Sequence, residues 1–278
     1  MLVQIHSDIH FEESYYHGTY EGTAKDRLLK MLKAHGPQEL IVTGDSGHKW
    51  TVADWEDITK IVQLTLLYGN HDDLKTLVRV RNADGTRALV DDGEVRSIGG
   101  LRFGFINGII GSRPKEGIPR KTPREFMLVA RELKSQGVDV LCMHDSPITD
   151  ARMSPTAHTR NVIYSAVMEM QPYYSIAGHV HGGTSIGYIG RTLHANIDSS
   201  QKWETYATLD TSKMKLSIWQ AMNRKPSIEY IRTDAPQREL ADVARDRKLS
   251  QKVADLFGRR HDSNRAGERQ KPVPLTAA

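Results

Sequence analysis

The amino-acid sequence predicts an α/β (α+β) fold in which two packed β-sheets are flanked by helices. Apolar, β-branched runs alternate with amphipathic stretches up to residue 177, which is typical of βαβ units. After residue 183 this rhythm changes to short strands joined by turn residues, which predicts antiparallel pairing. A chain of 278 residues can bury one sizeable core or two small ones.

Strands and amphipathic helices alternate through the first half of the chain. Leu28 and Leu32 lie on one face of a helix expected over residues 23–34, and Gly36 ends it. Pro123 suits the first turn of another helix, because the N–H that proline lacks has no intrahelical partner there. The same patterns predict further helices over 51–60, 73–79 and 122–135, strands over 2–7, 39–43, 61–68, 138–143 and 174–177, and a hairpin over 94–106.

Short strands are expected in the second half. Gly190 divides residues 184–197 into two strands, and two more flank the polar turn at 210–213. A last strand is expected over 227–231. The stretch that follows His144 is expected to be a loop, and it contains His158 and Arg160.

Composition narrows the class of protein. The chain is 38% hydrophobic and 26% charged, which is typical of globular proteins. No apolar run approaches the roughly 20 residues that a membrane helix needs, and the N-terminus shows no secretory signal pattern. The single cysteine, Cys142, excludes an internal disulfide and a cysteine-ligated zinc cluster. We therefore expect a reducing, cytoplasmic setting.

Side chains that bind metals occur in five short segments, each at the end of an apolar run. Asp8 and His10 are two residues apart, so both side chains can point the same way on an extended chain. His179 and His181 repeat this spacing. Glycines in these segments let the backbone approach an ion closely. The segments are Asp8-Ile9-His10, Gly44-Asp45, Gly69-Asn70-His71-Asp72, His144 and Gly178-His179-Val180-His181.

This set of oxygen and imidazole ligands suits a pair of divalent cations. Two cations ~3.5–4 Å apart neutralise the oxygens of a phosphate ester and lower the pKa of a water between them. Such a site needs one shared carboxylate, with imidazoles and hard oxygens around it. The sequence supplies each of these groups, and it predicts a two-metal phosphoesterase site at one edge of the sheets.

The order of these segments resembles that of the calcineurin-like metallophosphoesterases. The family pattern is D-x-H, GD, GNH[DE], a lone H and GHxH, and it matches residues 8–181. The resemblance implies a four-layer αββα sandwich, two ions of Mn²⁺, Fe²⁺/Fe³⁺ or Zn²⁺, attack by a hydroxide between them, and protonation of the leaving oxygen by His71. The ligands that it implies are Asp8, His10 and His181 for the first metal, Asn70, His144 and His179 for the second, and Asp45 for both.

One position departs from the family pattern. Many members have an acid three residues after the shared aspartate, where it orients the catalytic histidine, but this chain has His48 there. Asp72 is the candidate to take over that orienting role, and otherwise His71 is less basic than usual. His48 either reaches the substrate or packs beside the next helix. Trp50 either belongs to the core or stacks on a base or sugar of the substrate.

The sequence therefore favours a metal-dependent phosphoesterase that acts on nucleotide-type phosphodiesters. The alternatives are a DNA-end nuclease of the double-strand-break repair type, a phosphomonoesterase, and a non-catalytic scaffold of the same fold. The lack of a large capping region after residue 181 argues against the nuclease, and the complete ligand set argues against the scaffold. The expected partner is a phosphate ester, with nucleotides and nucleic acids among the options. The oligomeric state stays open.

Three regions are expected along the chain. Residues 1–233 form the catalytic domain, residues 234–258 an amphipathic C-terminal helix, and residues 259–278 a polar, disordered tail. Residues 232–278 hold 11 Lys+Arg and 7 Asp+Glu, which accounts for the whole net charge of +4. This basic excess indicates either affinity for a polyanion such as nucleic acid or a solvated tail.

Overall fold

The computed structural model describes residues 1–16, 18–111, 117–147, 157–181, 183–201, 203–220 and 225–231, all of which belong to one unit, Met1–Gln237. The helix expected over 234–258 and the polar tail expected over 259–278 lie outside these residues. Within the described part of the chain, no helix is both long and apolar enough to cross a membrane.

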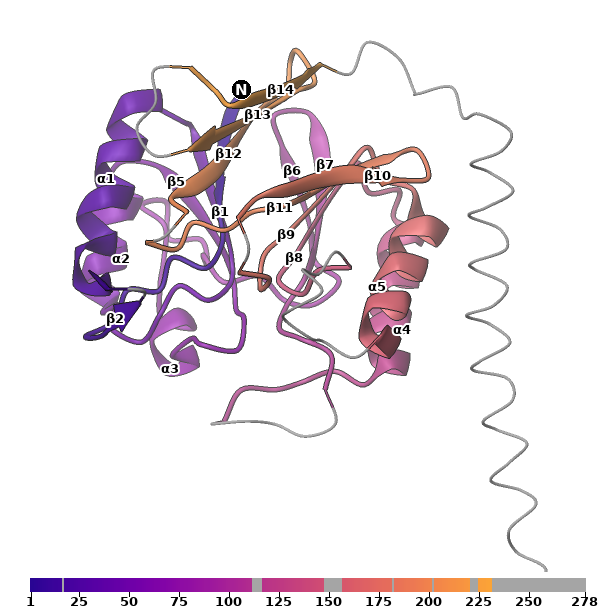
Figure 1. Ribbon diagram of the computed structural model, residues 1–278, viewed down its shortest axis with the longest axis horizontal. Coiled ribbons are helices and arrows are strands. Elements are labelled where there is room, and N and C mark those ends of the chain that lie inside the picture. Colours follow the sequence, from indigo (N-terminus) through magenta and orange to yellow (C-terminus); the bar gives the residue numbers. More distant parts are fainter. Residues whose placement is uncertain are drawn as a thin grey trace, which may run out of the picture. The chain divides into compact units, whose positions relative to one another are not determined.

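The first of two six-stranded sheets is built around the N-terminal strand (Figure 1). β1 pairs in parallel with β4, and β4 pairs in parallel with β5, so their carboxyl ends lie at one edge. Antiparallel strands extend the sheet on the other side of β1. In sheet order the strands are β14 (Ile228–Ile231), β13 (Lys215–Gln220), β12 (Thr205–Asp210), β1 (Leu2–His6), β4 (Glu39–Thr43) and β5 (Gln63–Leu67).

The second sheet has four parallel strands between two antiparallel edge strands. The antiparallel pairing expected after residue 183 is confirmed for β10 with β11, β12 with β13 and β13 with β14, whereas β11 pairs in parallel with β9. The chain passes from β9 to the sheet edge at β10, and the β10–β11 hairpin then returns it beside β9 in the same direction. In sheet order the strands are β10 (Ser185–Ile189), β11 (Thr192–Asn196), β9 (Tyr174–Ala177), β8 (Val140–Met143), β7 (Leu101–Ile106) and β6 (Val95–Ile98).

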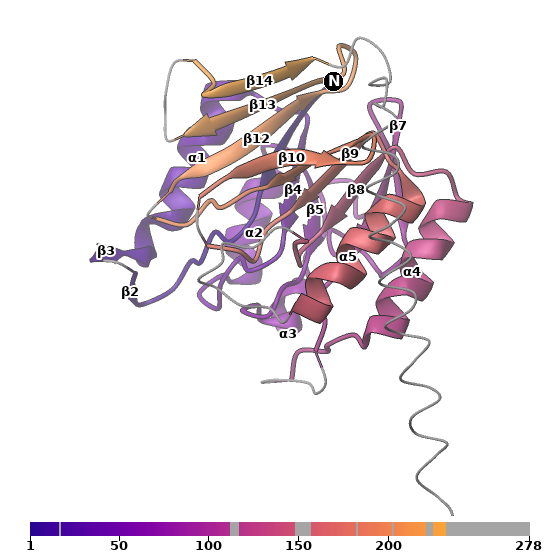
Figure 2. The ribbon, with the colours of Figure 1, turned by 45° about the vertical axis from the view of Figure 1, so that its right-hand side comes forward.

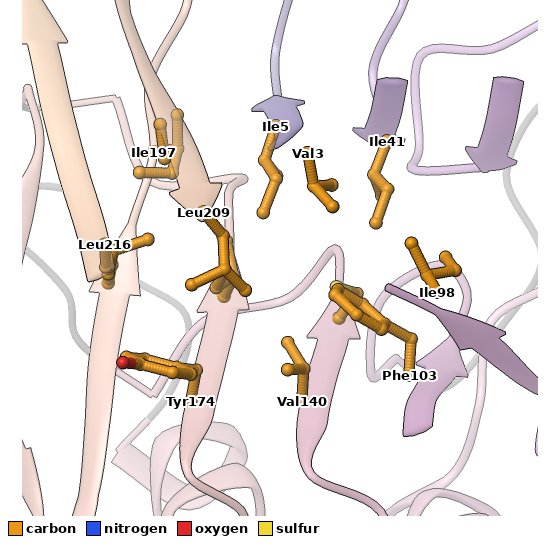
Figure 3. Packing of buried hydrophobic residues seen from close by; sticks show 14 of the residues in the cluster. Val3, Ile5, Ile41, Ile98, Phe103, Val140, Tyr174, Ile197, Leu209 and Leu216 are labelled. Carbon is orange, nitrogen blue, oxygen red and sulfur yellow. The ribbon is translucent and has the colours of Figure 1, made fainter. Parts of the chain in front are cut away.

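Each sheet has one face against the other sheet and one face against helices, which gives four layers (Figures 1 and 2). Val3, Ile5 and Ile41 of the first sheet meet Phe103 and Val140 of the second in a fully buried core (Figure 3). The expected αββα sandwich is therefore confirmed. The outer faces are covered by α1 (Ala24–His35) and α2 (Val52–Thr59) on the first sheet, and by α4 (Pro123–Ser135) and α5 (Ala157–Met170) on the second.

Helix boundaries follow the capping residues that the sequence offers. The Thr51 side chain accepts from the N–H of Asp54, and the Asp54 carboxylate accepts from the N–H of Thr51 in return, which starts α2. Thr122 and Glu125 make the same reciprocal pair at the start of α4. Three short elements complete the described fold, namely α3 (Leu74–Leu77), the 3₁₀ helix η1 (Glu21–Thr23) and a hairpin of β2 (Tyr15–Tyr16) and β3 (Thr19–Tyr20).

Helix α5 corrects the expectation of a loop around residues 158 and 160. Val162, Ile163, Ala166 and Val167 are at most 1% exposed and pack on the outer face of the second sheet. Their spacing of one, four and five residues places them on one side of a helix. The helical period was therefore present in the sequence, downstream of the polar segment that indicated a loop.

The parallel strands bring the candidate ligands to one edge of the sandwich. β1, β4 and β5 end at His6, Thr43 and Leu67, and β8 and β9 end at Met143 and Ala177. Each of the five candidate segments begins within two residues of one of these ends. Ligands bind at this edge of parallel sheets in many folds, because loops that leave neighbouring strands converge there.

Candidate metal centre

The first group of candidate ligands, here called the first cluster, consists of Asp8, His10 and His181. The Nε2 atoms of His10 and His181 are 3.3 Å apart. Oδ1 of Asp8 lies 3.6 Å from Nε2 of His181 and 3.9 Å from Nε2 of His10. One carboxylate oxygen and two imidazole nitrogens therefore face a common point, as they do around a bound divalent cation.

The second cluster consists of Asp45, His144 and His179, whose ligand atoms lie within 4.8 Å of one another. Oδ2 of Asp45 is 3.3 Å from Nε2 of His144. Oδ1 of Asp45 accepts from the backbone N–H of Asn70 at 2.6 Å and from that of His71 at 2.7 Å. These two bonds fix the orientation of the carboxylate and hold Asn70 beside the cluster.

Three inward-facing atoms of this region are buried without a hydrogen-bond partner among the described residues. They are Oδ1 of Asp8, Oδ1 of Asn70 and Nε2 of His144. Oδ1 of Asp8 and Nε2 of His144 do lie at ion-pair distance from Nε2 of His181 and Oδ2 of Asp45, at 3.6 and 3.3 Å, but none of the three atoms has a hydrogen bond to a described residue. A buried polar atom without a hydrogen bond costs about 1–3 kcal/mol, so atoms of this kind at one place require compensation. Divalent cations would provide it, since carboxylate, amide and imidazole atoms are all good ligands for such ions. The residues present therefore fit a metal centre.

The backbone at the site adopts conformations that ordinary side chains avoid. Asp8, His10, Asp45 and His179 have φ angles of 56°, 48°, 51° and 66°, in the left-handed region. Each such residue costs on the order of 1–3 kcal/mol when it is not glycine. Outliers of this kind gather at functional sites, and four of the candidate ligands are among them.

Two glycines permit the close approach of the segments. A Cβ atom on Gly69 would lie 2.1 Å from Oδ1 of Asp45 and 2.5 Å from Nε2 of His144. A Cβ atom on Gly178 would lie 2.3 Å from Oδ2 of Asp8. Only glycine fits at these positions, because any side chain would occupy the space of a candidate ligand.

Two imidazoles are oriented by partners on the side away from the cluster. Nδ1 of His144 lies 2.9 Å from the carbonyl oxygen of Thr43, which leaves Nε2 for a cation. Nδ1 of His181 lies 3.3 Å from Oδ1 of Asp198, a buried carboxylate. The sequence analysis missed Asp198. Its signal is an acid shortly after β11, the same position relative to a strand end as that of Asp8 and Asp45.

The Asp72 carboxylate contacts the loop that carries Asp45 and does not orient His71. Its Oδ2 accepts from the N–H groups of Asp45 and Gly69 at 2.8 and 2.7 Å. Its Oδ1 accepts from the N–H of Ser46 at 2.8 Å and from the Ser46 hydroxyl. With both oxygens engaged in this way, Asp72 is a positioning residue for Asp45, which differs from the expected role.

Burial keeps two of the histidines neutral. It lowers the pKa of His179 to about 3 and that of His10 to about 4, against the opposing attraction of Asp45. A neutral imidazole has a free lone pair, so these side chains need lose no proton to bind a cation. Burial also raises the pKa of Asp8 to about 6, because the carboxylate has lost its hydration.

The other two histidines carry positive charge. Burial opposes their protonation, but the Asp45 carboxylate raises the pKa of His144 to about 10, and the Asp198 carboxylate raises that of His181 to about 9. Protons on these rings balance the buried negative charge. Cations that bind here would displace those protons, because a ligating imidazole is neutral. The electrostatic field of the site therefore favours positive ions.

A match to a family model shows the superfamily of this chain. The model of the calcineurin-like phosphoesterase superfamily domain matches residues 1–214. The chain belongs to this superfamily. Membership supports a metal-dependent hydrolase of phosphate esters in general, and the two clusters hold the ligand types that such an enzyme needs. No curated protein sequence matches the chain.

Solved structures share the fold of this calcineurin-like phosphoesterase at low identity. TT1561 of Thermus thermophilus is 13% identical with a TM-score of 0.58, over 79% of this chain and 98% of that one. GAP50, described as the anchor in the inner membrane complex of Plasmodium, is 8% identical with a TM-score of 0.52, over 88% and 93%. Likeness at these identities shows the fold alone.

His71 lies beside His10, next to the first cluster. Its ring centroid lies 5.6 Å from that of His10, and its side chain belongs to neither cluster. His48 is exposed, and its backbone N–H donates to Oε1 of Glu12 at 2.8 Å. The roles proposed for these two histidines in the phosphoesterase are therefore compatible with where they lie.

The structure corrects the expectation that Trp50 stacks on a substrate. Its side chain is only 2% exposed and stacks on Trp55 with ring centroids 4.0 Å apart. Its Nε1 donates to the carbonyl oxygen of Ser46 at 2.9 Å. Trp50 lies directly before the cap of α2, and its ring turns under the helix into the core against the first sheet.

Proposed function

We propose that this chain is a phosphodiesterase that works with two divalent cations. The observation that carries the proposal is the pair of clusters at one sheet edge, whose inward-facing Asp8, Asn70 and His144 atoms have no partner among the described residues. Asp8, His10 and His181 would hold one cation, and Asn70, His144 and His179 the other. Asp45 would serve both.

The bound cations would supply positive charge to the phosphate oxygens and acidify a water molecule near them. The chain itself fixes the geometry. Asp45 is held by the N–H groups of Asn70 and His71, and its loop is held by Asp72. Such fixed positions lower the barrier, because no reorganisation is needed when charge develops on the phosphate.

His71 is proposed as the proton donor to the leaving oxygen. It lies beside His10, where a group bound at the first cluster would meet it. General acid catalysis typically contributes ~10²–10⁴-fold, and most when the leaving alkoxide is a strong base. A histidine that is not itself a ligand is suited to this task, since its nitrogen lone pair and proton stay available.

The other readings of the sequence have less support. Trp50, one of the two reasons for favouring nucleotides, is buried, and the second, the basic tail, lies outside the described residues. A scaffold role has the example of GAP50, which is described as an anchor. Against it, every ligand position in this chain is filled. A phosphomonoesterase remains as an outcome of the test, whereas bis-p-nitrophenyl phosphate does not distinguish a DNA-end nuclease from other phosphodiesterases.

The test compares two substrates and two variants. Purified protein with added Mn²⁺ is expected to hydrolyse bis-p-nitrophenyl phosphate faster than p-nitrophenyl phosphate. Asp45→Asn keeps the size of the side chain but removes its charge, and it is expected to lower kcat/KM more than about 100-fold. The control is Asp57→Asn on the exposed face of α2, which is expected to keep full activity.

Three results would contradict parts of the proposal. Faster turnover of the monoester would contradict the diester preference. No turnover of either substrate by protein that holds both cations would favour the scaffold. A failure to bind Mn²⁺, Fe²⁺ or Zn²⁺ by metal analysis would contradict the metal centre itself.

A further inference from the structure

The small β2–β3 hairpin (Figure 2) carries Tyr16, whose ring lies beside that of His181 in the first cluster. The ring centroid of Tyr16 lies 5.8 Å from that of His181, with an angle of 50° between the ring planes. Tyr16 is half-buried, whereas its neighbour Tyr15 is 73% exposed. Consecutive residues of a strand point to opposite faces, so the hairpin turns one aromatic face toward the first cluster and the other away from it.

Contacts on both sides hold the hairpin in place. Ser14 donates from its hydroxyl to Oε2 of Glu21 at 2.5 Å and accepts at its carbonyl from the N–H of Glu21 at 2.9 Å. Gln201 donates from Nε2 to the carbonyl oxygen of Tyr20 at 2.7 Å. Gln201 belongs to the loop that also carries Asp198, the partner of His181. The position of Tyr16 is therefore fixed relative to the first cluster.

Four rings follow one another in a series of contacts, here called the row. The centroid distances are 5.8 Å from Tyr16 to His181, 5.0 Å from His181 to His10, and 5.6 Å from His10 to His71. Tyr16 and His71 are therefore the first and last members of the row, and they adjoin different histidines of the first cluster. The two ends offer different chemistry, a proton donor at His71 and an aromatic face at Tyr16.

A phosphodiester has two ester groups that need different surroundings. One alcohol leaves and takes a proton, while the other stays on the phosphate. If the leaving oxygen meets His71, the retained group lies toward the other end of the row. A tyrosine face binds flat, apolar rings such as nucleobases or aryl groups by stacking, with little regard to which ring it is.

We propose that Tyr16 binds the retained ester group of a phosphodiester and selects diesters in which this group carries an aromatic ring or nucleobase. This inference rests on the proposed phosphodiesterase function and names its substrate class. Burial, together with the carboxylates of Asp198, Glu21 and Asp8, raises the pKa of the Tyr16 phenol. The phenol is therefore neutral and does not repel the phosphate.

The experiment uses diesters that share one leaving group, p-nitrophenol, and differ only in the retained group. Methyl p-nitrophenyl phosphate has no ring there, phenyl p-nitrophenyl phosphate has an aryl ring, and the p-nitrophenyl ester of thymidine 5′-phosphate has a nucleobase. The measured quantity is the ratio of kcat/KM for each ring-bearing diester to that for the methyl diester. Comparing this ratio between variants cancels the intrinsic reactivities of the substrates.

Tyr16→Leu is expected to lower both ratios about 10-fold, the effect of losing one stacking contact. Tyr16→Phe and Tyr16→Trp keep an aromatic face and are expected to keep the ratios within about twofold. The matched control is Tyr15→Leu, the same substitution on the opposite face of the same hairpin. It is expected to leave the ratios unchanged.

Several outcomes would overturn the inference. An equal loss on all three diesters in Tyr16→Leu, with reduced metal content, would make Tyr16 a support of the first cluster only. A loss in Tyr16→Phe as large as in Tyr16→Leu would assign the effect to the hydroxyl group. Unchanged ratios in Tyr16→Leu would contradict it while leaving the phosphodiesterase function intact. No turnover of any diester by the unmodified protein would contradict that function as well.

Discussion

The two clusters lie at different depths, and the difference separates a fixed part of the centre from an accessible one. In the second cluster, the side chains of Asp45 and His144 are 1% and 0% exposed, and only His179 is partly exposed. In the first, only Asp8 is buried, and the side chains of His10 and His181 are 14% and 17% exposed. The rings of Tyr16 and His71 also adjoin the first cluster. We infer that substrate enters over the first cluster while the second holds its geometry.

The groups that hold the candidate ligating histidines in place also differ between the two clusters. His144 is held by a backbone carbonyl, that of Thr43, which ends the interior strand β4. His181 is held by the carboxylate of Asp198, which a single substitution can change. A backbone partner fixes the ring without altering its charge, whereas a carboxylate also makes the ring a stronger ligand. The two clusters can therefore be perturbed separately.

The largest expected effect comes from Gly69→Ala, which would place a methyl group against ligands of the second cluster. The new methyl group would lie 2.1 Å from Oδ1 of Asp45, so the carboxylate or the Asn70 loop must move. Because Asp45 would serve both cations, its displacement is expected to release bound metal. It would also disturb the fixed geometry on which catalysis depends, so kcat/KM is expected to fall more than about 1,000-fold. Activity and metal content per chain measure this.

A matched glycine shows whether the effect is local. A Cβ atom on Gly187, in strand β10, meets no atom within 4 Å, so Gly187→Ala is expected to keep full activity. Gly178→Ala is the counterpart at the first cluster, where the methyl group would lie 2.3 Å from Oδ2 of Asp8. Normal metal content in Gly69→Ala would contradict the assignment of the second cluster.

The glycines also show why the ligands could be predicted from the sequence. Each ligand lies just past a buried strand, and each glycine allows an approach that is visible as a motif. Parallel strands then bring such residues to one edge without any long-range information. The five segments predicted candidate ligands at one edge, and their division into two ligand sets came from the resemblance to the family. The structure gathers Asp8, His10 and His181 in one group and Asp45, His144 and His179 in another.

Residues that act through packing or through distant loops could not be predicted in the same way. Trp50 is next to the site in sequence, but its burial depends on Trp55 and on how α2 lies on the sheet. Asp72 is adjacent to His71, yet its carboxylate bonds to a loop 26 residues earlier. Tyr16 belongs to no motif, and Asp198 shares only its place after a strand end with Asp8 and Asp45, so only the folded chain shows that both lie beside His181.

The second expected effect comes from Asp198→Asn, which acts on the first cluster alone. Asparagine keeps the size and an oxygen acceptor for Nδ1 of His181 but removes the negative charge. Loss of such an outer partner typically costs ~10–100-fold in metal affinity or activity. We expect one of the two cations to be bound about 10–100-fold more weakly, and the other to be unchanged.

Metal titration by calorimetry separates the two binding events. The activity lost in Asp198→Asn is expected to return when the concentration of Mn²⁺ is raised, because the ligand atoms themselves are intact. The control is again Asp57→Asn, which removes one exposed acid far from the clusters. Equal weakening of both cations in Asp198→Asn would contradict the view that the two clusters are held independently.

The smallest expected effect concerns His194, a buried imidazole outside the two clusters that sharpens the comparison. Its side chain lies between the hydroxyls of Ser146 and Ser175, at 3.3 and 3.1 Å. Burial lowers its pKa to about 3, whereas His144, equally buried but beside Asp45, has a pKa raised to about 10. Burial alone therefore leaves a histidine neutral, and the carboxylates of the clusters account for the opposite sign at His144.

This difference gives His194 a defined effect on stability. The unfolded chain protonates the residue near pH 6.5 and the folded chain only near pH 3, so the unfolded state binds more protons between these values. The free energy of unfolding therefore falls as the pH is lowered through this range. From pH 7 to pH 5, His194 is expected to account for a loss of about 2 kcal/mol, at 1.36 kcal/mol per pKa unit.

His194→Gln removes the titrating group but can still bond to both serine hydroxyls. Urea unfolding of metal-free protein at pH 7 and pH 5 is expected to show a drop in the free energy of unfolding that is about 2 kcal/mol smaller in the variant than in the unmodified chain. Metal-free protein is needed because cations at the two clusters add their own pH dependence through ligand protons. An equal drop in both proteins would mean that the folded chain accepts a proton at His194. In that case burial without a carboxylate would not be enough to keep an imidazole of this fold neutral.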